Sequence, residues 1–128
     1  MDTPELRFNP PVPIIRMFDV GQTKDFYLNF LGFTLDWEHT FDENFPLYMQ
    51  ISRSGCVIHL SEHYGDCSPG AALRIETDNV ADLHSRLLSQ QYKYARPGLE
   101  NTPWGTKEIQ LTDPSGNRII FYQPSPPA

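Results

Sequence analysis

Histidine and carboxylate side chains are the residues in this sequence that could carry acid–base or metal chemistry. His59 lies within an apolar run at 57–60, and Glu62 and His63 follow it closely. A general base needs an orienting partner and a substrate proton within reach, and a catalytic metal needs three or more protein donors. The sequence shows no orienting partner for His59, while Glu62, His63 and Glu76 lie near enough in sequence to leave a metal site open on the residues alone. We therefore predict a hydrogen-bonded histidine and no catalytic residue.

The composition excludes several function classes. The 128 residues carry 10 Lys+Arg against 16 Asp+Glu, a formal net charge of −6, whereas nucleic-acid binding requires clustered positive charge. The sequence contains no glycine-rich nucleotide motif and no G-x-S-x-G elbow. No apolar run reaches the length of a membrane span, about 18–20 residues, and no secretory signal pattern is present. We therefore expect a cytoplasmic protein with neither nucleic acid nor membrane as a partner. Cys56 and Cys67 form no C-x-x-C pair and are expected to be reduced.

Two predicted helices, which must support any site, occupy corresponding places in the two halves of the chain. The first follows Asp19, and its apolar face consists of Phe26, Tyr27, Phe30 and Leu31. Gly32 stands where a glycine commonly ends a helix. The second follows Asn79, and its apolar face consists of Val80, Leu83, Leu87 and Leu88. Asn79 with Asp82 three residues later resembles a capping box.

Extended runs flank each helix in the same order. In the first half they lie at 12–18, 33–39, 47–52 and 56–62, and in the second at 71–77, 92–96, 107–112 and 118–123. The order βαβββ therefore occurs twice. It predicts an α+β fold in one domain, residues 1–128, with modules at about 12–62 and 71–123.

Period-2 alternation assigns one face of each predicted sheet to the core and leaves the other face open. The open-face positions are Arg16, Tyr48, Gln50, His59, Ser61, Arg74, Glu76, Glu108, Gln110, Arg118 and Tyr122. A concave open face is a candidate ligand surface, while a solvated surface and a dimer face are the alternatives. We expect Arg16, Arg74 and Glu76 to form an ion pair between the modules, with anion binding as the alternative.

Four segments of the chain resemble the glyoxalase/bleomycin resistance protein/dioxygenase superfamily, also called vicinal oxygen chelate. They are residues 14–20, 25–33, 57–60 and 113–119, and together the resemblance covers about 12–123. Pro103-Trp104-Gly105 followed by Glu108 is similar to the bleomycin-resistance branch in particular. The resemblance implies paired βαβββ modules that form an incomplete eight-stranded barrel.

In metal-using members of this superfamily, four side chains hold a divalent ion. By resemblance those positions fall here on Val12, His59, Ala72 and Ile120, of which only the imidazole offers a lone pair. The resemblance is therefore to the metal-poor bleomycin-resistance branch, which binds a bulky cationic glycopeptide without chemical change. It implies a binding protein without a cofactor. A metal-dependent glyoxalase-like lyase or dioxygenase is the alternative.

Resemblance to that branch implies a small-molecule ligand stacked on aromatic rings and attracted by carboxylates. The candidate ligand-binding residues are Phe41, Phe45, Tyr48, His59, Ser61, Glu62, Trp104 and Glu108. Trp37 shares the core-facing alternation of Phe33 and Leu35, so we expect it in the core. Trp104 could stack on the ligand or cover a hydrophobic cluster. The loop at 41–45 could gate the cleft or be an ordinary connection.

The same resemblance implies a homodimer that holds its ligand in a groove between subunits and exchanges an N-terminal arm. The proline-rich residues 1–13 suit such an arm, because proline disfavours helix and removes an amide donor. Residues 124–128 are expected to form a flexible tail.

Overall fold

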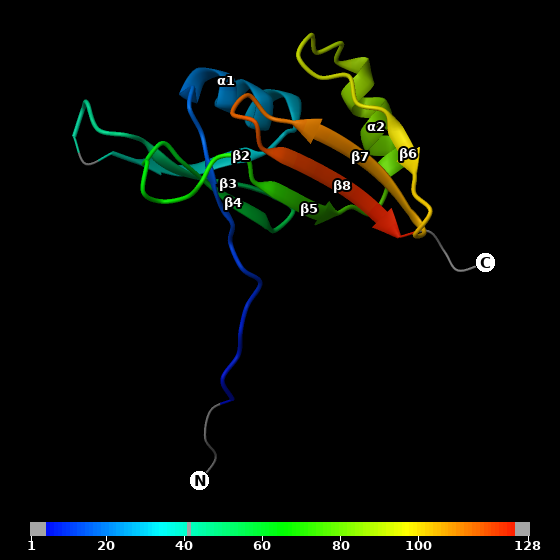
Figure 1. The fold of residues 1–128 in the computed structure, drawn as a ribbon, viewed down its shortest axis with the longest axis horizontal. Helices are drawn as coiled ribbons and strands as arrows, with labels where there is room; N and C mark the ends of the chain where they lie inside the picture. Colours follow the sequence, from blue (N-terminus) through cyan, green and yellow to red (C-terminus); the bar gives the residue numbers. More distant parts are fainter. Residues whose placement is uncertain (1–4, 41, 125–128) are drawn as a thin grey trace.

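The chain folds into two βαβββ units, which confirms the predicted α+β class (Figure 1). The computed structural model describes residues 5–40 and 42–124. The first unit contains β1 (Ile14–Arg16), α1 (Val20–Lys24), the π-helix η1 (Asp25–Phe30), β2 (Thr34–His39), β3 (Tyr48–Arg53) and β4 (Cys56–Ser61). The second contains β5 (Ala72–Glu76), α2 (Val80–Ser89), β6 (Leu99–Asn101), β7 (Thr106–Thr112) and β8 (Arg118–Pro124).

Each unit forms its own four-stranded mixed sheet. The strand orders are β1-β4-β3-β2 and β5-β8-β7-β6, and in both sheets the first two strands are parallel and the others antiparallel. We call them sheet 1 and sheet 2. Alternate residues such as Ile15, Met49 and Ile109 are almost completely buried, as the period-2 pattern predicts. They pack with the helices into one hydrophobic core that both units share.

The first helix widens after one turn. Asp19 caps α1 by accepting a hydrogen bond from the Gln22 amide at 2.8 Å. The chain then continues as η1, and the Leu31 amide donates to the Phe26 carbonyl five residues back at 3.0 Å. The predicted apolar face is buried. The sequence pattern indicated a regular α-helix, however, and did not predict the π-helical turn. Gly32 follows with φ +77°, as expected for a helix-ending glycine.

The predicted strand at 92–96 is wrong. The Tyr92 ring instead stacks on Phe30 with the ring centroids 4.4 Å apart. The segment turns, with the Ala95 amide donating to the Tyr92 carbonyl at 3.4 Å. The partly buried ring packs against η1, and residues 92–96 form no strand. The edge strand of sheet 2 therefore forms later, as β6.

The turn between β7 and β8 fastens the two units together. The buried Tyr27 hydroxyl donates to Asp113 Oδ2 at 2.6 Å. Asn117 Nδ2 donates to the same carboxylate at 2.9 Å and to the Arg16 carbonyl at 2.8 Å. Burial, and then the Asp113 carboxylate, raise the pKa of Tyr27. Residues of α1–η1, β1 and this turn are thus held in fixed relation.

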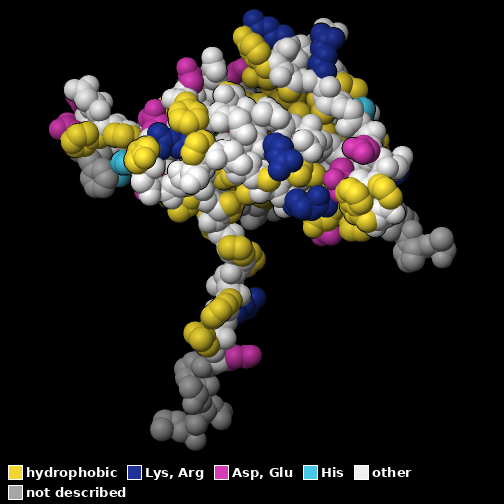
Figure 2. Space-filling view, in the orientation of Figure 1, with side chains coloured by type: hydrophobic (Ala, Val, Ile, Leu, Met, Phe, Trp, Pro, Cys, Tyr) yellow, Lys and Arg dark blue, Asp and Glu magenta, His cyan; other side chains and the backbone are white. Residues whose placement is uncertain are grey.

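Residues 5–13 form an extended arm that leaves the body of the molecule (Figure 1). Its hydrophobic side chains, including Leu6 and Phe8, are exposed along its length (Figure 2). The arm joins the sheet at Pro13, whose carbonyl accepts a hydrogen bond from the His59 amide at 3.0 Å. Within the described part of the chain, no helix is both long and apolar enough to cross a membrane.

Candidate functional site

A β-bulge in β2 reverses the alternation that predicted a buried Trp37. Leu35 faces Ile51 across the sheet, but the next paired residue is Trp37, which faces Gln50. Asp36 is therefore an extra residue, and every side chain after it changes face. Trp37 lies on the open face of sheet 1 with 43% of its surface exposed, so its expected core position is wrong.

Trp37, Tyr48 and His59 form an aromatic cluster on the open face of sheet 1. The Trp37 and Tyr48 rings stack with centroids 5.9 Å apart and an interplanar angle of 11°. The His59 ring meets Trp37 edge-on at 5.4 Å. Three strands supply these residues, so the cluster stands on a rigid sheet. It presents a fixed aromatic surface to solvent.

Polar contacts run from this cluster to the bulge. Tyr48 Oη lies 2.6 Å from His59 Nδ1, and His59 Nε2 lies 2.9 Å from Gln50 Oε1. Gln50 Nε2 donates to Asp36 Oδ2 at 3.0 Å. Burial lowers the pKa of His59, so the neutral imidazole is favoured. Hydrogen bonds from Gln50 and Ser52 lower the pKa of Asp36, so the carboxylate is favoured.

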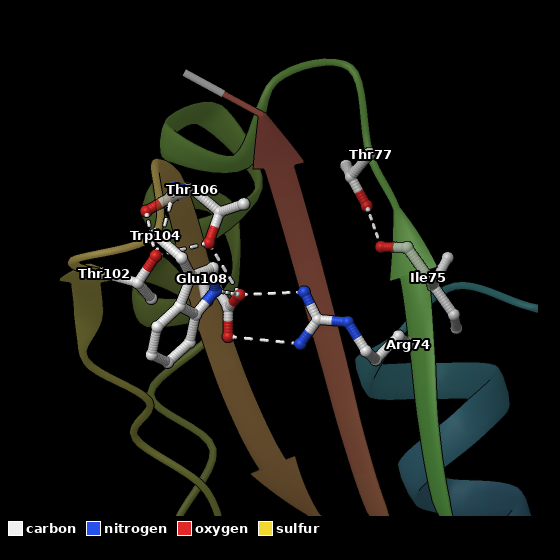
Figure 3. Close-up of polar contacts among 7 residues, drawn as sticks. All are labelled: Arg74, Ile75, Thr77, Thr102, Trp104, Thr106 and Glu108. Atoms are coloured by element: carbon white, nitrogen blue, oxygen red, sulfur yellow. Dashed lines mark hydrogen bonds and ion pairs between the residues drawn. The ribbon is translucent and has the colours of Figure 1, made fainter.

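Glu108 organises a second cluster on the open face of sheet 2. Arg74 reaches it across β8, and Trp104 and Thr106 approach it from the other side (Figure 3). Glu108 Oε2 accepts from Arg74 Nη2 at 2.9 Å, from Thr106 Oγ1 at 2.7 Å and from Trp104 Nε1 at 3.4 Å. The Arg74 guanidinium also lies over the Tyr122 ring, 4.4 Å from its centroid. The hydrogen bonds orient an indole that is 68% exposed.

The charges in this second cluster stabilise each other. The hydrogen bond from Arg74, followed by that from Thr106, lowers the pKa of Glu108. The same bond to Glu108 raises the pKa of Arg74. Arg74 thus pairs within its own sheet, and the ion pair expected between Arg16, Arg74 and Glu76 is wrong. Arg16 instead lies over the Phe18 ring, and its buried Nε has no hydrogen-bond partner in the described ranges.

The remaining predicted site residues lie outside these two clusters. Ser61 is buried and donates to Asp66 Oδ2 at 2.6 Å. Glu62 accepts from the Leu47 amide at 2.8 Å. Phe45 is exposed in the loop before β3, and Phe41 lies outside the described residues. The structure therefore brings together Tyr48 with His59, and Trp104 with Glu108.

Sequence reasoning missed several members of the clusters. Trp37 was predicted on the core face because it continues the alternation of Phe33 and Leu35, and the bulge between Leu35 and Trp37 does not interrupt that pattern in the sequence. Gln50 and Arg74 stand at predicted open-face positions, so their pairing with His59 and Glu108 could have been proposed from strand register. The alternation hides the bulge, and the local hint that remains is Asp36 itself, a residue type that strands disfavour.

The donor set does not suit the divalent ion found in metal-using relatives of this fold. The side chains at the corresponding positions, Val12, Ala72 and Ile120, are hydrocarbon and offer no donor atom. Both ring nitrogens of His59 already take part in hydrogen bonds. Over residues 5–40 and 42–124, no group of three or more His, Cys, Asp or Glu side chains could hold a metal ion.

A cavity of about 450 Å³ lies away from both clusters, between the two units. Its walls come from the β3–β4 turn, the end of β5 and the first turns of α2. Its apolar floor includes Phe33, Ile75 and Phe121. Among the predicted ligand-binding residues that the structure describes, none lines it.

Comparison with known proteins gives one family and a consistent set of folds. The family described as "Glyoxalase superfamily protein" matches residues 2–125. No curated protein matches the sequence significantly.

Solved structures align over nearly the whole chain. TnmS3, an antibiotic binding protein from Streptomyces sp. CB03234, is 25% identical, with a TM-score of 0.70 over 94% of this chain and 100% of its own. A bleomycin resistance determinant encoded on transposon Tn5 is 20% identical, with a TM-score of 0.71 over 91% and 98%. The bleomycin-binding protein from Streptomyces verticillus, complexed with copper(II)-bleomycin, is 23% identical, with a TM-score of 0.66 over 96% and 100%.

Proposed function

The chain belongs to the glyoxalase superfamily, and from this we propose that it binds a bulky, cationic aromatic small molecule and releases it unchanged. The observation that carries the proposal is a pair of exposed indoles, each held in a fixed orientation on an open sheet face. Trp37 is fixed by stacking on Tyr48, and Trp104 by its hydrogen bond to Glu108. Flat heterocycles stack on such surfaces.

Charge also favours a cationic ligand. The formal net charge is −6, and the Asp36 carboxylate adds negative charge to the cluster of Trp37, whereas the charge of Glu108 is balanced by Arg74. Antibiotic- and bleomycin-binding proteins share the fold, which makes bleomycin the first ligand to test. The proposed site needs no metal, because it acts by stacking and charge rather than by bond cleavage.

Isothermal titration with metal-free bleomycin tests the proposal directly. We expect saturable binding, and recovery of intact bleomycin by mass spectrometry. Trp37→Ala and Trp104→Ala should each weaken binding by about tenfold, as expected from the loss of a stacking contact and its buried area. Tyr94→Ala is the matched control, since it removes an exposed ring outside both clusters. If the tryptophan variants bind as tightly as the control, the assigned surface is wrong.

The alternative is a metal-dependent lyase or dioxygenase of the same superfamily. Elemental analysis of the purified protein separates the two functions. About one tightly held transition-metal ion per subunit would favour the enzyme. A protein that binds bleomycin equally well before and after chelator treatment would favour the binding function.

We propose in addition that the protein is a homodimer that exchanges residues 1–13 and assembles its ligand groove between subunits. The two clusters stand on different sheets of one chain, so each offers half of a site. The exposed Leu6 and Phe8 suit burial against a partner. Mixing Trp37→Ala and Trp104→Ala proteins tests the shared groove. Heterodimers would regain one intact groove, whereas sites built within single subunits would stay defective.

A further inference from the structure

The contacts between Asp36 and Tyr48 form a chain in which each hydrogen bond fixes the direction of the next. Asp36 is the unambiguous end, because an ionised carboxylate only accepts. Gln50 must therefore point its amide nitrogen at Asp36, at 3.0 Å, and its carbonyl oxygen at His59. The opposite amide orientation would bring two oxygens together.

The orientation of Gln50 then fixes the tautomer of His59. Gln50 Oε1 lies 2.9 Å from His59 Nε2, so Nε2 must carry the hydrogen. In a neutral imidazole the other nitrogen is then an acceptor. His59 Nδ1 faces Tyr48 Oη at 2.6 Å, so the Tyr48 hydroxyl must donate its single hydrogen to it.

This chain determines what Tyr48 can offer to a ligand. We infer that Tyr48 is a specificity-determining residue that acts toward the ligand only as a hydrogen-bond acceptor, so the cluster selects ligand groups that carry N–H or O–H donors. The Tyr48 hydroxyl already donates its hydrogen to His59. Toward a ligand, its oxygen can therefore only accept a hydrogen bond. The preferred ligand class is therefore an aromatic compound with a primary or secondary ammonium, or an amide N–H, beside the ring.

The protonation states that the chain requires agree with its surroundings. Burial lowers the pKa of His59, which keeps the imidazole neutral. Burial, followed by nearby Asp66 and Cys67, raises the pKa of Tyr48, which keeps its hydrogen in place. Gln50 and Ser52 stabilise the Asp36 carboxylate. The inference rests on the proposed function for the existence of a ligand. The donor and acceptor roles in this series of hydrogen bonds can, however, be measured without a ligand.

Nitrogen NMR of His59 near neutral pH provides the ligand-free test. We expect a protonated Nε2 and an unprotonated Nδ1. Asp36→Asn should change the tautomer populations, because an amide at position 36 no longer dictates how Gln50 turns. Glu38→Gln is the control, since Glu38 pairs instead with Lys24 at 2.8 Å. A wild-type protein in which the hydrogen resides on Nδ1 would overturn the inference.

Two probes of equal charge and ring size test the selectivity. Benzylammonium carries N–H donors, and benzyltrimethylammonium carries none. We expect the affinity ratio, benzylammonium over benzyltrimethylammonium, to fall by roughly threefold to tenfold in Tyr48→Phe, the range of one net hydrogen bond. Trp37→Ala should weaken both probes and leave the ratio unchanged.

An unchanged ratio in Tyr48→Phe would refute the acceptor role of Tyr48 while leaving the binding function intact. No response to either probe at millimolar concentration would refute the cationic aromatic site of the proposed function, and this inference with it.

Discussion

Replacing Asp113 with alanine should be among the most damaging single changes in this protein. The carboxylate accepts hydrogen bonds from the Tyr27 hydroxyl at 2.6 Å, the Ser115 amide at 2.8 Å, and the Asn117 amide and side chain at 2.9 Å each. Asn117 Nδ2 keeps the Arg16 carbonyl as a second acceptor, but the Tyr27 hydroxyl and the Asn117 amide are buried and lose theirs. A buried donor without a partner costs about 1–3 kcal/mol. We therefore expect the free energy of unfolding to fall by about 3–5 kcal/mol.

Urea unfolding followed by tryptophan fluorescence measures this loss, with Asp19→Ala as the control. Asp19 is also an acidic residue that accepts an amide hydrogen bond, but at an exposed helix cap, where the cost is about 1 kcal/mol. A second comparison isolates the cause. Tyr27→Phe should destabilise the wild type by about 1–2 kcal/mol, yet should be neutral or stabilising in Asp113→Ala, because it removes the orphaned hydroxyl. If Tyr27→Phe is equally harmful in both backgrounds, the hydrogen bond between these residues does not carry the stability.

Three further predictions concern the backbone, pH and the aromatic cluster. Gly32→Ala should cost about 1–2 kcal/mol, because φ is +77° and the new Cβ would lie 3.0 Å from Arg53 Nη1. Gly98→Ala, with open space around it, is the control for the same urea measurement. Burial depresses the pKa of His59 in the folded state, so its contribution to stability is present above about pH 6.5 and is lost as pH falls through the folded-state value. His59→Gln should therefore lose less stability than the wild type between neutral and mildly acidic pH, and an identical loss would contradict this. Trp37→Phe should retain most of the bleomycin affinity that Trp37→Ala loses, as measured by calorimetry, since a ring still covers Tyr48. Equal losses in the two variants would show that stacking is not the interaction used.

The fold was predictable because its signals repeat. Apolar alternation along the strands, the apolar face of each helix and the turn residues at 113–117 all indicate the same βαβββ order. The capping residue Asn79 was also predictable, and it accepts the Asp82 amide at 3.0 Å. The capping pattern thus predicted where the helix begins. The Asp82 carboxylate, however, forms an ion pair with Arg86 on the same helix.

One segment of the fold and one contact of the site were less predictable, because both depend on residues distant in sequence. Tyr92 belongs to the core since Phe30, sixty-two positions earlier, provides a stacking partner. No local pattern encodes that contact, so a run with strand propensity was placed in the wrong element. Arg74 on β5 reaches Glu108 on β7 because only one strand, β8, lies between them. The pairing therefore follows from sheet order, which the sequence indicates only after the topology is assigned.

The bulge at Asp36 has a consequence for how this protein could change over generations. A single inserted residue decides whether the indole that follows it points outward or inward. A one-codon deletion there would return Trp37 to the interior side of its strand and erase the aromatic surface, although no tryptophan would be lost. A relative lacking that codon would have nearly the same composition and a different binding surface.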